Sequence, residues 1–204
     1  MSFYSERILP HLIQMSMKQE HLEPYRRRVT AAAHGDVLEI GVGSGLNLSL
    51  YQPGTHIVGL DPSARLLAMA REATADRAQT IDLIEGSAES IPFPDHEFDT
   101  VITTWTMCSI PDLPKALAEV RRVLKDDGRL VFAEHGRAPD PKVVCWQNAL
   151  TPVWKRIGGG CHLNRPIDQL IAAAGFRVDG LKTGYMKGPK PMTFMYEGEA
   201  SIVR

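Results

Sequence analysis

The sequence predicts an α/β fold in which a mostly parallel sheet is covered by helices. From residue 36 onward, short apolar runs alternate with helical stretches, which is typical of parallel strands joined by helices. A glycine-rich turn directly follows the first of these runs. The composition is that of a globular protein, with 204 residues, 44% hydrophobic side chains, and 23 Lys and Arg against 24 Asp and Glu. Together these observations favour one α/β domain over residues 1–204.

Composition also excludes several classes of protein. A chain of this length can bury a core large enough to fold without disulfides or a structural metal. Its three cysteines, Cys108, Cys145 and Cys161, are scattered and odd in number, which favours a reducing, cytoplasmic location. No apolar run approaches the roughly 20 residues of a transmembrane helix, so at most a peripheral membrane contact is expected. Balanced charge without a dense Lys/Arg stripe disfavours a nucleic-acid partner. The oligomeric state is not indicated.

The first half of the chain divides into a helical segment and a run of strands. Residues 5–33 read as one or two helices, which we expect to form an N-terminal lid over residues 1–34. The expected strands of the cofactor-binding core, residues 35–136, are 37–40, 56–60, 80–84, 100–104 and 129–133. Pro62 is expected at the first position of a helix over residues 62–73. Asp112 should open the next helix, and residues 126–128 should form the turn between that helix and the fifth strand.

The remainder is less regular. Residues 137–165 contain three prolines, two tryptophans and three consecutive glycines, and are expected to form a cap over the site. A last helix over residues 167–174 is closed by Gly175. Two further strands, 176–181 and 192–197, then complete a C-terminal unit of helix and hairpin over residues 166–204.

The most informative motif is the glycine-rich turn after the first strand. Residues 37–47 run from a buried strand through Gly41, Gly43 and Gly45 into a helical stretch, and glycines at such a turn let a ligand approach the backbone. A dinucleotide fold requires G-x-G-x-x-G, but here Leu46 occupies the last position and the spacing is G-x-G-x-G. Glu39 precedes the first glycine by two residues, where its carboxylate can reach a ligand ammonium group.

With this motif the chain resembles the class I S-adenosylmethionine-dependent methyltransferases. Residues 58–63, 85–93, 98–102 and 120–128 resemble further blocks of that family, so the likeness spans most of the chain. The resemblance implies a Rossmann-like sheet of seven strands, the last antiparallel, with S-adenosylmethionine as cofactor. Asp61 matches the acid that accepts the ribose hydroxyls, and residues 86–89 match the adenine segment. The residues assigned in this way to the cofactor are Glu39, Gly41, Gly43, Ser44, Gly45, Asn47, Asp61, Pro62, Ser63, Gly86, Ser87, Ala88, Glu89 and Thr104.

A narrower resemblance concerns the acceptor. Residues 104–110, 132–135 and 160–165 look like the small alkyl-thiol methyltransferases, which favours a small, partly apolar thiol. Quinone C-methyltransferases and lipid-amine N-methyltransferases are alternatives by general pattern. Two other classes also stay open, a Rossmann oxidoreductase, disfavoured by Leu46, and a cofactor-binding protein without turnover.

Candidate catalytic residues follow from where ligands bind in such sheets. The loops after the fourth and fifth strands border the ligand, because ligands bind at the carboxyl ends of parallel strands. This places Glu134 near the site and makes His135 a candidate base, Cys108 a candidate thiol and Trp105 a candidate for contact with the sulfonium. Each has a purely structural alternative, as a strand-end histidine, a small core residue or a packing aromatic. The candidates for substrate contact are Met107, Trp146, His162 and Arg165.

No metal is expected. Cys145 and the adjacent Cys161 and His162 invite comparison with zinc sites, but their spacing fits neither C-x-x-C nor H-x-x-x-H.

Overall fold

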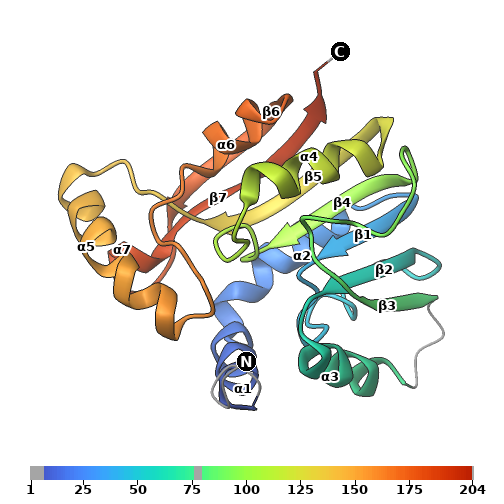
Figure 1. Cartoon of the computed structure of the whole chain (residues 1–204), viewed down its shortest axis with the longest axis horizontal. Helices are drawn as coiled ribbons and strands as arrows, with labels where there is room; N and C mark the ends of the chain where they lie inside the picture. Colours follow the sequence, from blue (N-terminus) through green and yellow to red (C-terminus); the bar gives the residue numbers. More distant parts are fainter. Residues whose placement is uncertain (1–6, 76–79, 204) are drawn as a thin grey trace.

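The computed structural model describes residues 7–75 and 80–203 and contains a seven-stranded sheet in the order β3-β2-β1-β4-β5-β7-β6 (Figure 1). The strands are β1 (Asp36–Ile40), β2 (His56–Asp61), β3 (Ile81–Glu85), β4 (Phe98–Thr104), β5 (Leu124–His135), β6 (Phe176–Tyr185) and β7 (Phe194–Ile202). β7 runs antiparallel to both of its neighbours, and the other pairs are parallel. The predicted sheet, mostly parallel with its last strand antiparallel, is confirmed.

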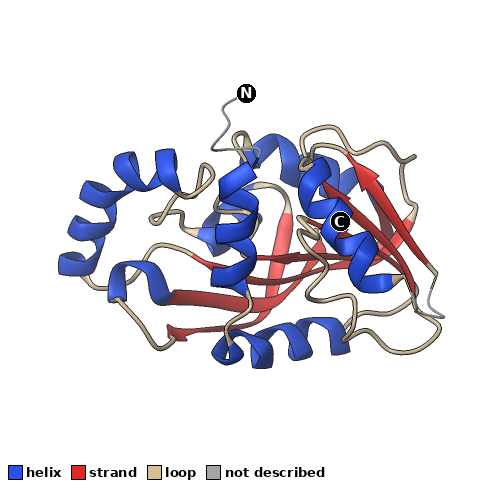
Figure 2. Ribbon diagram, turned by 90° about the horizontal axis from the view of Figure 1, so that it is seen from below, coloured by secondary structure: helices blue, strands red, loops and turns tan. Residues whose placement is uncertain are grey.

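Helices cover both faces of this sheet (Figure 2). They are α1 (Leu9–Met17), the 3-10 helix η2 (Glu20–Leu22), α2 (Glu23–Ala31), α3 (Ala64–Thr74), α4 (Leu113–Val123), α5 (Pro141–Ile157), α6 (Ile167–Ala173) and α7 (Lys190–Thr193). Because successive side chains of a strand point to opposite faces, neighbouring residues of β1 enter different cores. Val37 packs in the cluster that includes residues of α2 and α3, and Leu38 packs in the cluster that includes residues of α4 and α6.

The N-terminal segment is more divided than expected. The one or two helices predicted over residues 5–33 are α1, η2 and α2, and residues 5 and 6 of that range lie outside the described residues. Pro10 and Pro24 stand in the first turns of α1 and α2, where a missing backbone N–H costs no hydrogen bond. In the described part of the chain, no helix has the length and apolar character to cross a membrane.

Several predicted element boundaries are wrong. The strands predicted over residues 176–181 and 192–197 are β6 (Phe176–Tyr185) and β7 (Phe194–Ile202), and residues 190–193 form α7. α3 begins at Ala64, so Pro62 is not its first residue, and the Ser63 side chain caps the helix by accepting from the Leu66 N–H at 3.3 Å. The helix does not extend back beyond Ser63, whose own N–H is already bonded to the Asp61 carboxylate.

Another such boundary is the start of β5. Asp112 caps α4 as predicted, accepting from the Lys115 N–H. However, β5 pairs with β4 from Leu124, before the predicted turn at residues 126–128, and the register then shifts, so that those residues form an irregularity within the strand.

The segment over residues 137–165 contains a regular element that the sequence analysis did not predict. α5 occupies Pro141–Ile157 and continues through Pro152. After it, residues 158–160 turn the chain back toward the sheet, and the Gly159 and Gly160 φ angles of 64° and 85° are readily available only to glycine. α6 and the hairpin of β6 and β7 follow, with α7 in the connecting loop.

Candidate functional site

The candidate site lies where β1, β2, β4 and β5 end. These strands are parallel, so their carboxyl ends meet at one edge of the sheet and bring Glu39, Asp61, Thr104 and His135 to that edge.

The glycine turn leaves backbone open beside this edge. Gly41, Gly43 and Gly45 have φ angles of 71°, 57° and 80°. A side chain at Gly41 would overlap Thr106, and one at Gly45 would approach Leu48 to 2.9 Å. Beside Gly43, by contrast, the nearest atom to a built Cβ is a backbone oxygen 3.9 Å away. The turn therefore packs against the protein at two glycines and leaves space for a ligand at the third.

Asp61 fastens this turn to β2. One of its carboxylate oxygens accepts from the Gly43 N–H at 3.0 Å, and the other accepts from the Ser63 N–H at 2.8 Å. The side chain is buried, and that burial raises the pKa of its carboxyl despite the two hydrogen bonds. Pro62 lies between Asp61 and Ser63 in the chain. A carboxylate has about four acceptor positions, so Asp61 keeps acceptor capacity for a ligand hydroxyl.

Glu39 is the centre of a buried polar network. Its two oxygens accept from Asn47 Nδ2 at 2.8 Å and from the Tyr51 hydroxyl at 2.7 Å. Asn47 also donates to Thr104 Oγ1 at 3.1 Å and accepts from Arg26 Nη1 at 2.8 Å. Burial raises the pKa of Glu39 to about 7, against the lowering effect of these neighbours.

The network joins residues that sequence analysis assigned to the cofactor with two that it missed. Tyr51 and Arg26 belong to no motif, and only the fold brings them to Glu39. Ser44, in the glycine turn, is also buried.

The predicted adenine segment lies beside Asp61. The Gly86 N–H donates to the Asp61 carbonyl at 3.2 Å, and the Ser87 hydroxyl accepts from the Glu89 N–H at 3.2 Å. Ala88 is buried, whereas Glu89 is accessible and accepts from the Asp112 N–H at 2.7 Å. The four residues thus form a short structured turn after β3.

The loop after β4 is held from both sides. Trp105 has a φ of 50°, unusual for a bulky residue, and lies under the Arg26 guanidinium, 5.0 Å from the ring centroid, and against the Tyr25 ring. Its indole Nε1 is buried without a hydrogen-bond partner among the described residues. Trp105 therefore has an indole N–H without a partner in the described part of the chain, while its ring packs against Tyr25 and Arg26 of α2.

Glu134 anchors the same loop from β5. Its carboxylate is completely buried and accepts from the Thr106 and Met107 N–H groups at 3.0 and 3.2 Å. Burial raises the pKa of Glu134 to about 8. Sequence analysis placed Glu134 near the site but gave it no role; a carboxylate directly after the apolar run at residues 130–133 was the available signal.

Of the four candidates for substrate contact, three are near this loop. Met107 is buried, and its carbonyl accepts from Arg165. The Cys108 carbonyl accepts from the His162 N–H at 2.8 Å. Trp146, in contrast, is 63% exposed on α5 and is not part of this cluster.

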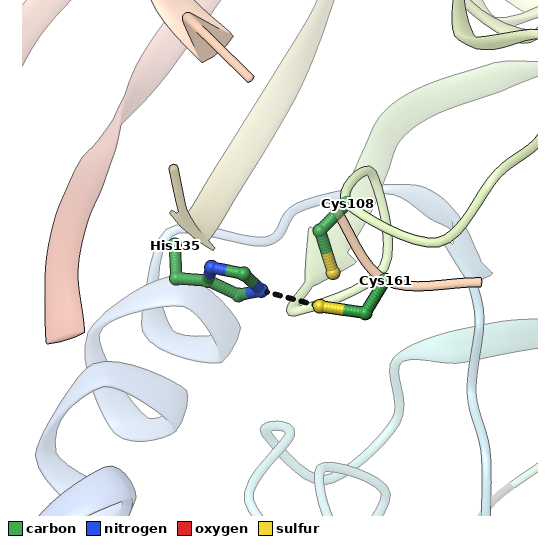
Figure 3. Close-up of side chains that lie close together, drawn as sticks. All are labelled: Cys108, His135 and Cys161. Carbon is green, nitrogen blue, oxygen red and sulfur yellow. Dashed lines mark hydrogen bonds between the residues drawn. The ribbon is translucent and has the colours of Figure 1, made fainter. Parts of the chain in front are cut away.

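The candidate catalytic residues Cys108 and His135 lie next to Cys161 (Figure 3). His135 Nε2 is 3.1 Å from the Cys161 sulfur, and all three side chains are buried. The Cys161 thiol and the His135 imidazole lower the pKa of Cys108 well below its usual range, whereas the same contact and burial raise that of Cys161. Cys145 is exposed and apart from them.

Comparison with known proteins gives one family. Residues 38–132 match the model of a methyltransferase domain. The thiol S-methyltransferase TMT1B of Rattus norvegicus is 35% identical over 144 residues, 69% of this chain and 59% of that protein. The phosphatidylethanolamine N-methyltransferase of Cereibacter sphaeroides is 36% identical over 155 residues, 74% of this chain and 75% of that protein. The chain thus spans about three fifths of the thiol methyltransferase's length.

Solved structures give the same fold. A SAM-dependent methyltransferase from Methanosarcina mazei has a TM-score of 0.69 with 19% identity, covering 91% of this chain and 99% of that one. A SAM-dependent methyltransferase from Aquifex aeolicus has a TM-score of 0.66 with 17% identity, and the match covers 95% of this chain and 98% of that one.

Proposed function

We propose that this chain, which belongs to the S-adenosylmethionine-dependent methyltransferases, methylates the sulfur of a small, partly apolar thiol. The observation that carries the cofactor half of this proposal is the open backbone at Gly43, tied by Asp61 to the end of β2. The thiol half is supported by the relatives named as thiol S-methyltransferases.

The residues present fit the cofactor. Asp61 would accept from the ribose hydroxyls, and the turn at residues 41–45 would hold the methionine part. Glu39 uses two of its acceptor positions on Asn47 and Tyr51, which leaves others for the methionine ammonium group. The segment over residues 86–89 would border the adenine. When bound, the cofactor supplies a methyl group on a positively charged sulfur.

In the transfer, the protein positions the acceptor and the cofactor and excludes water from the site. Methyl transfer from a sulfonium disperses charge, so the largest contribution comes from holding the nucleophile in line with the methyl group in a dry site. The buried Glu134 fixes the backbone of the loop that carries Trp105 and Met107 through two hydrogen bonds. A thiol acceptor attacks as its thiolate, which removes the need for a strong base.

A second candidate is transfer to a lipid amine. It is favoured by the similarity to the phosphatidylethanolamine N-methyltransferase, of which this chain covers 75%. Transfer to a quinol carbon is the third acceptor chemistry among the relatives, represented by the ubiquinone/menaquinone C-methyltransferase of Methylobacterium nodulans. The proposed partner in each case is a small molecule, not a nucleic acid, in the cytoplasm.

The test is a transfer assay with methyl-labelled S-adenosylmethionine. The purified chain is given an alkyl thiol, an aryl thiol, a demethylated quinol and phosphatidylethanolamine in separate reactions. We expect label in the thioethers and none above background in the other products. Label in the quinol or the lipid alone overturns the thiol assignment, and cofactor binding without any labelled product favours a binding protein without turnover.

A further inference from the structure

Three side chains that are far apart in the sequence converge at the end of β5. Cys108 comes from the loop after β4, His135 ends β5, and Cys161 follows α5. Figure 3 shows both sulfurs and the imidazole ring turned toward one another. The two Sγ atoms and a histidine nitrogen lie within 4.8 Å of one another, and the exposed fractions of the three residues are 3%, 7% and 8%.

The backbone around the three ligand atoms is fixed. The Cys108 carbonyl accepts from the His162 N–H at 2.8 Å, which joins the segment after α5 to the loop after β4. Gly160, which has a φ of 85°, lies close to the same loop, since a built Cβ there would be 3.2 Å from the Ser109 carbonyl. Glu134 holds the preceding part of the loop through two backbone N–H groups. The convergence is therefore built by three segments and does not depend on one flexible side chain.

The donor set selects a class of metal ion. Two thiol sulfurs and one imidazole suit zinc and other thiophilic ions, whereas magnesium and calcium take oxygen ligands. Tetrahedral zinc, with Zn–S near 2.3 Å and Zn–N near 2.1 Å, separates sulfur from nitrogen by about 3.6 Å. The 3.1 Å contact between His135 and Cys161 would open by about 0.5 Å to admit the ion, a movement within side-chain reach.

We propose that Cys108, His135 and Cys161 bind one zinc ion and leave its fourth position open to the sulfur of the acceptor. Three protein ligands with an open position are the pattern of catalytic zinc sites, and two cysteines with one histidine are one of its known forms. This departs from the sequence-based expectation of no metal, which rested on local spacing and on Cys145, a residue outside the trio.

The role given to the fourth coordination position rests on the proposed function, because it requires the acceptor to be a thiol. A thiol that binds zinc releases its proton to solvent and stays bound as a thiolate. Its sulfur then forms the new S–CH3 bond as the bond between methyl and sulfonium breaks, and the sulfonium sulfur keeps that electron pair. The products are a thioether and S-adenosylhomocysteine.

The test uses cobalt as a spectroscopic substitute for zinc in the reduced, metal-free full chain under anaerobic conditions. We expect one equivalent to bind, with a thiolate-to-cobalt charge-transfer band and the strong visible bands of tetrahedral cobalt, and zinc to displace it. Cys108→Ser and Cys161→Ser should each lose the charge-transfer band. Cys145→Ser is the matched control and should keep it, since this cysteine is exposed on α5. Thermal unfolding of each metal-free variant checks that it is folded.

A second arm tests the open position without turnover. Addition of an alkyl thiol to the cobalt-loaded chain, in the absence of S-adenosylmethionine, should intensify the charge-transfer band while cobalt stays on the protein through gel filtration. An unchanged band overturns the acceptor position. Failure of the reduced chain to bind cobalt, or equal loss in Cys145→Ser, overturns the metal site. Neither outcome depends on methyl transfer, so a wrong acceptor assignment is detected separately by the labelled-methyl assay.

Discussion

At the end of β2, a single carboxylate connects the glycine turn to the start of the next helix. The Asp61 carboxylate accepts from the Gly43 N–H through one oxygen and from the Ser63 N–H through the other, so the orientation of the side chain is fixed before any ligand binds. A ligand hydroxyl then meets a preorganised acceptor, which lowers the entropy that binding must overcome.

We expect Asp61→Ala to weaken S-adenosylmethionine binding by roughly 2 to 4 kcal/mol, through loss of charge-assisted hydrogen bonds. Titration calorimetry measures the change. The matched control is Asp99→Ala, because Asp99 also accepts from a backbone N–H, that of Asp36, but at the opposite end of the strands. Asp99→Ala should lower stability and leave the affinity unchanged. Equal affinities for Asp61→Ala and the unmodified chain would show that Asp61 does not contact the cofactor.

The pH dependence of stability should report Glu39. Its pKa is about 7 in the folded chain against an ordinary value of 4.5. Between these values the folded state holds a proton that the unfolded state has released, so the free energy of unfolding falls as pH rises through this interval. Glu39→Gln, which keeps a side chain able to bond Asn47 and Tyr51, should flatten that slope.

Urea unfolding of both proteins at several pH values tests this expectation. The difference between their free energies of unfolding should change between pH 4.5 and 7 and then level off. A constant difference would mean that Glu39 ionises normally in the folded protein.

Sequence analysis identified residues of the site within a motif but not those contributed by the fold. Glu39, Asp61 and the glycines are recognisable because they stand at fixed spacings around a strand end. Arg26 and Tyr51 are not, because they reach Glu39 and Asn47 only when α2 and the segment after the glycine turn pack together. The proximity of Cys108, His135 and Cys161 was not predicted for the same reason, because only the fold brings these three residues together.

Among the elements, the helix α2 contributes a buried side chain to the candidate site. Arg26 reaches from this helix to Asn47 and lies over Trp105, so it links the N-terminal segment to two loops of the sheet edge. The predicted lid over residues 1–34 thus contributes a buried side chain, in addition to any covering role.

We expect Arg26→Ala to destabilise the fold by about 1 to 3 kcal/mol, because it leaves the buried Asn47 oxygen without its donor. It should also weaken cofactor binding, since Asn47 bonds Glu39. The adjacent Arg27 is the control. It is exposed and pairs with Glu23 one helical turn away, so Arg27→Ala should cost less than about 1 kcal/mol. Denaturant unfolding and calorimetry of the two variants check this, and similar losses would contradict it.

The elements that sequence analysis misjudged are those where a local signal competes with packing. Pro152 and three glycines suggested irregular chain, but α5 runs from Pro141 to Ile157 through Pro152, and the three glycines follow its end. The strand β5 starts four residues before its glycine because Leu124 pairs with Phe98 across the sheet. Long-range pairing of this kind has no local signature.

For the molecule as a whole, the parallel sheet explains why the site exists at one edge. Two apolar layers cover its faces, and polar side chains gather where β1, β2, β4 and β5 end. The alternation of strands and helices, visible in the sequence, predicts this arrangement. What it does not predict is the acceptor, because the relatives include a thiol S-methyltransferase, a phosphatidylethanolamine N-methyltransferase and a quinone C-methyltransferase.

The most direct test of the account is thermal unfolding of the chain with S-adenosylmethionine, S-adenosylhomocysteine, NAD or no ligand. A ligand present at 100 times its dissociation constant adds about 2.7 kcal/mol to the stability of the folded state. We predict that the two sulfur nucleotides raise the unfolding temperature, that NAD does not, and that Asp61→Ala reduces the rise. In folded, ligand-free protein, no rise with either sulfur nucleotide, or a rise with NAD alone, would contradict the cofactor site.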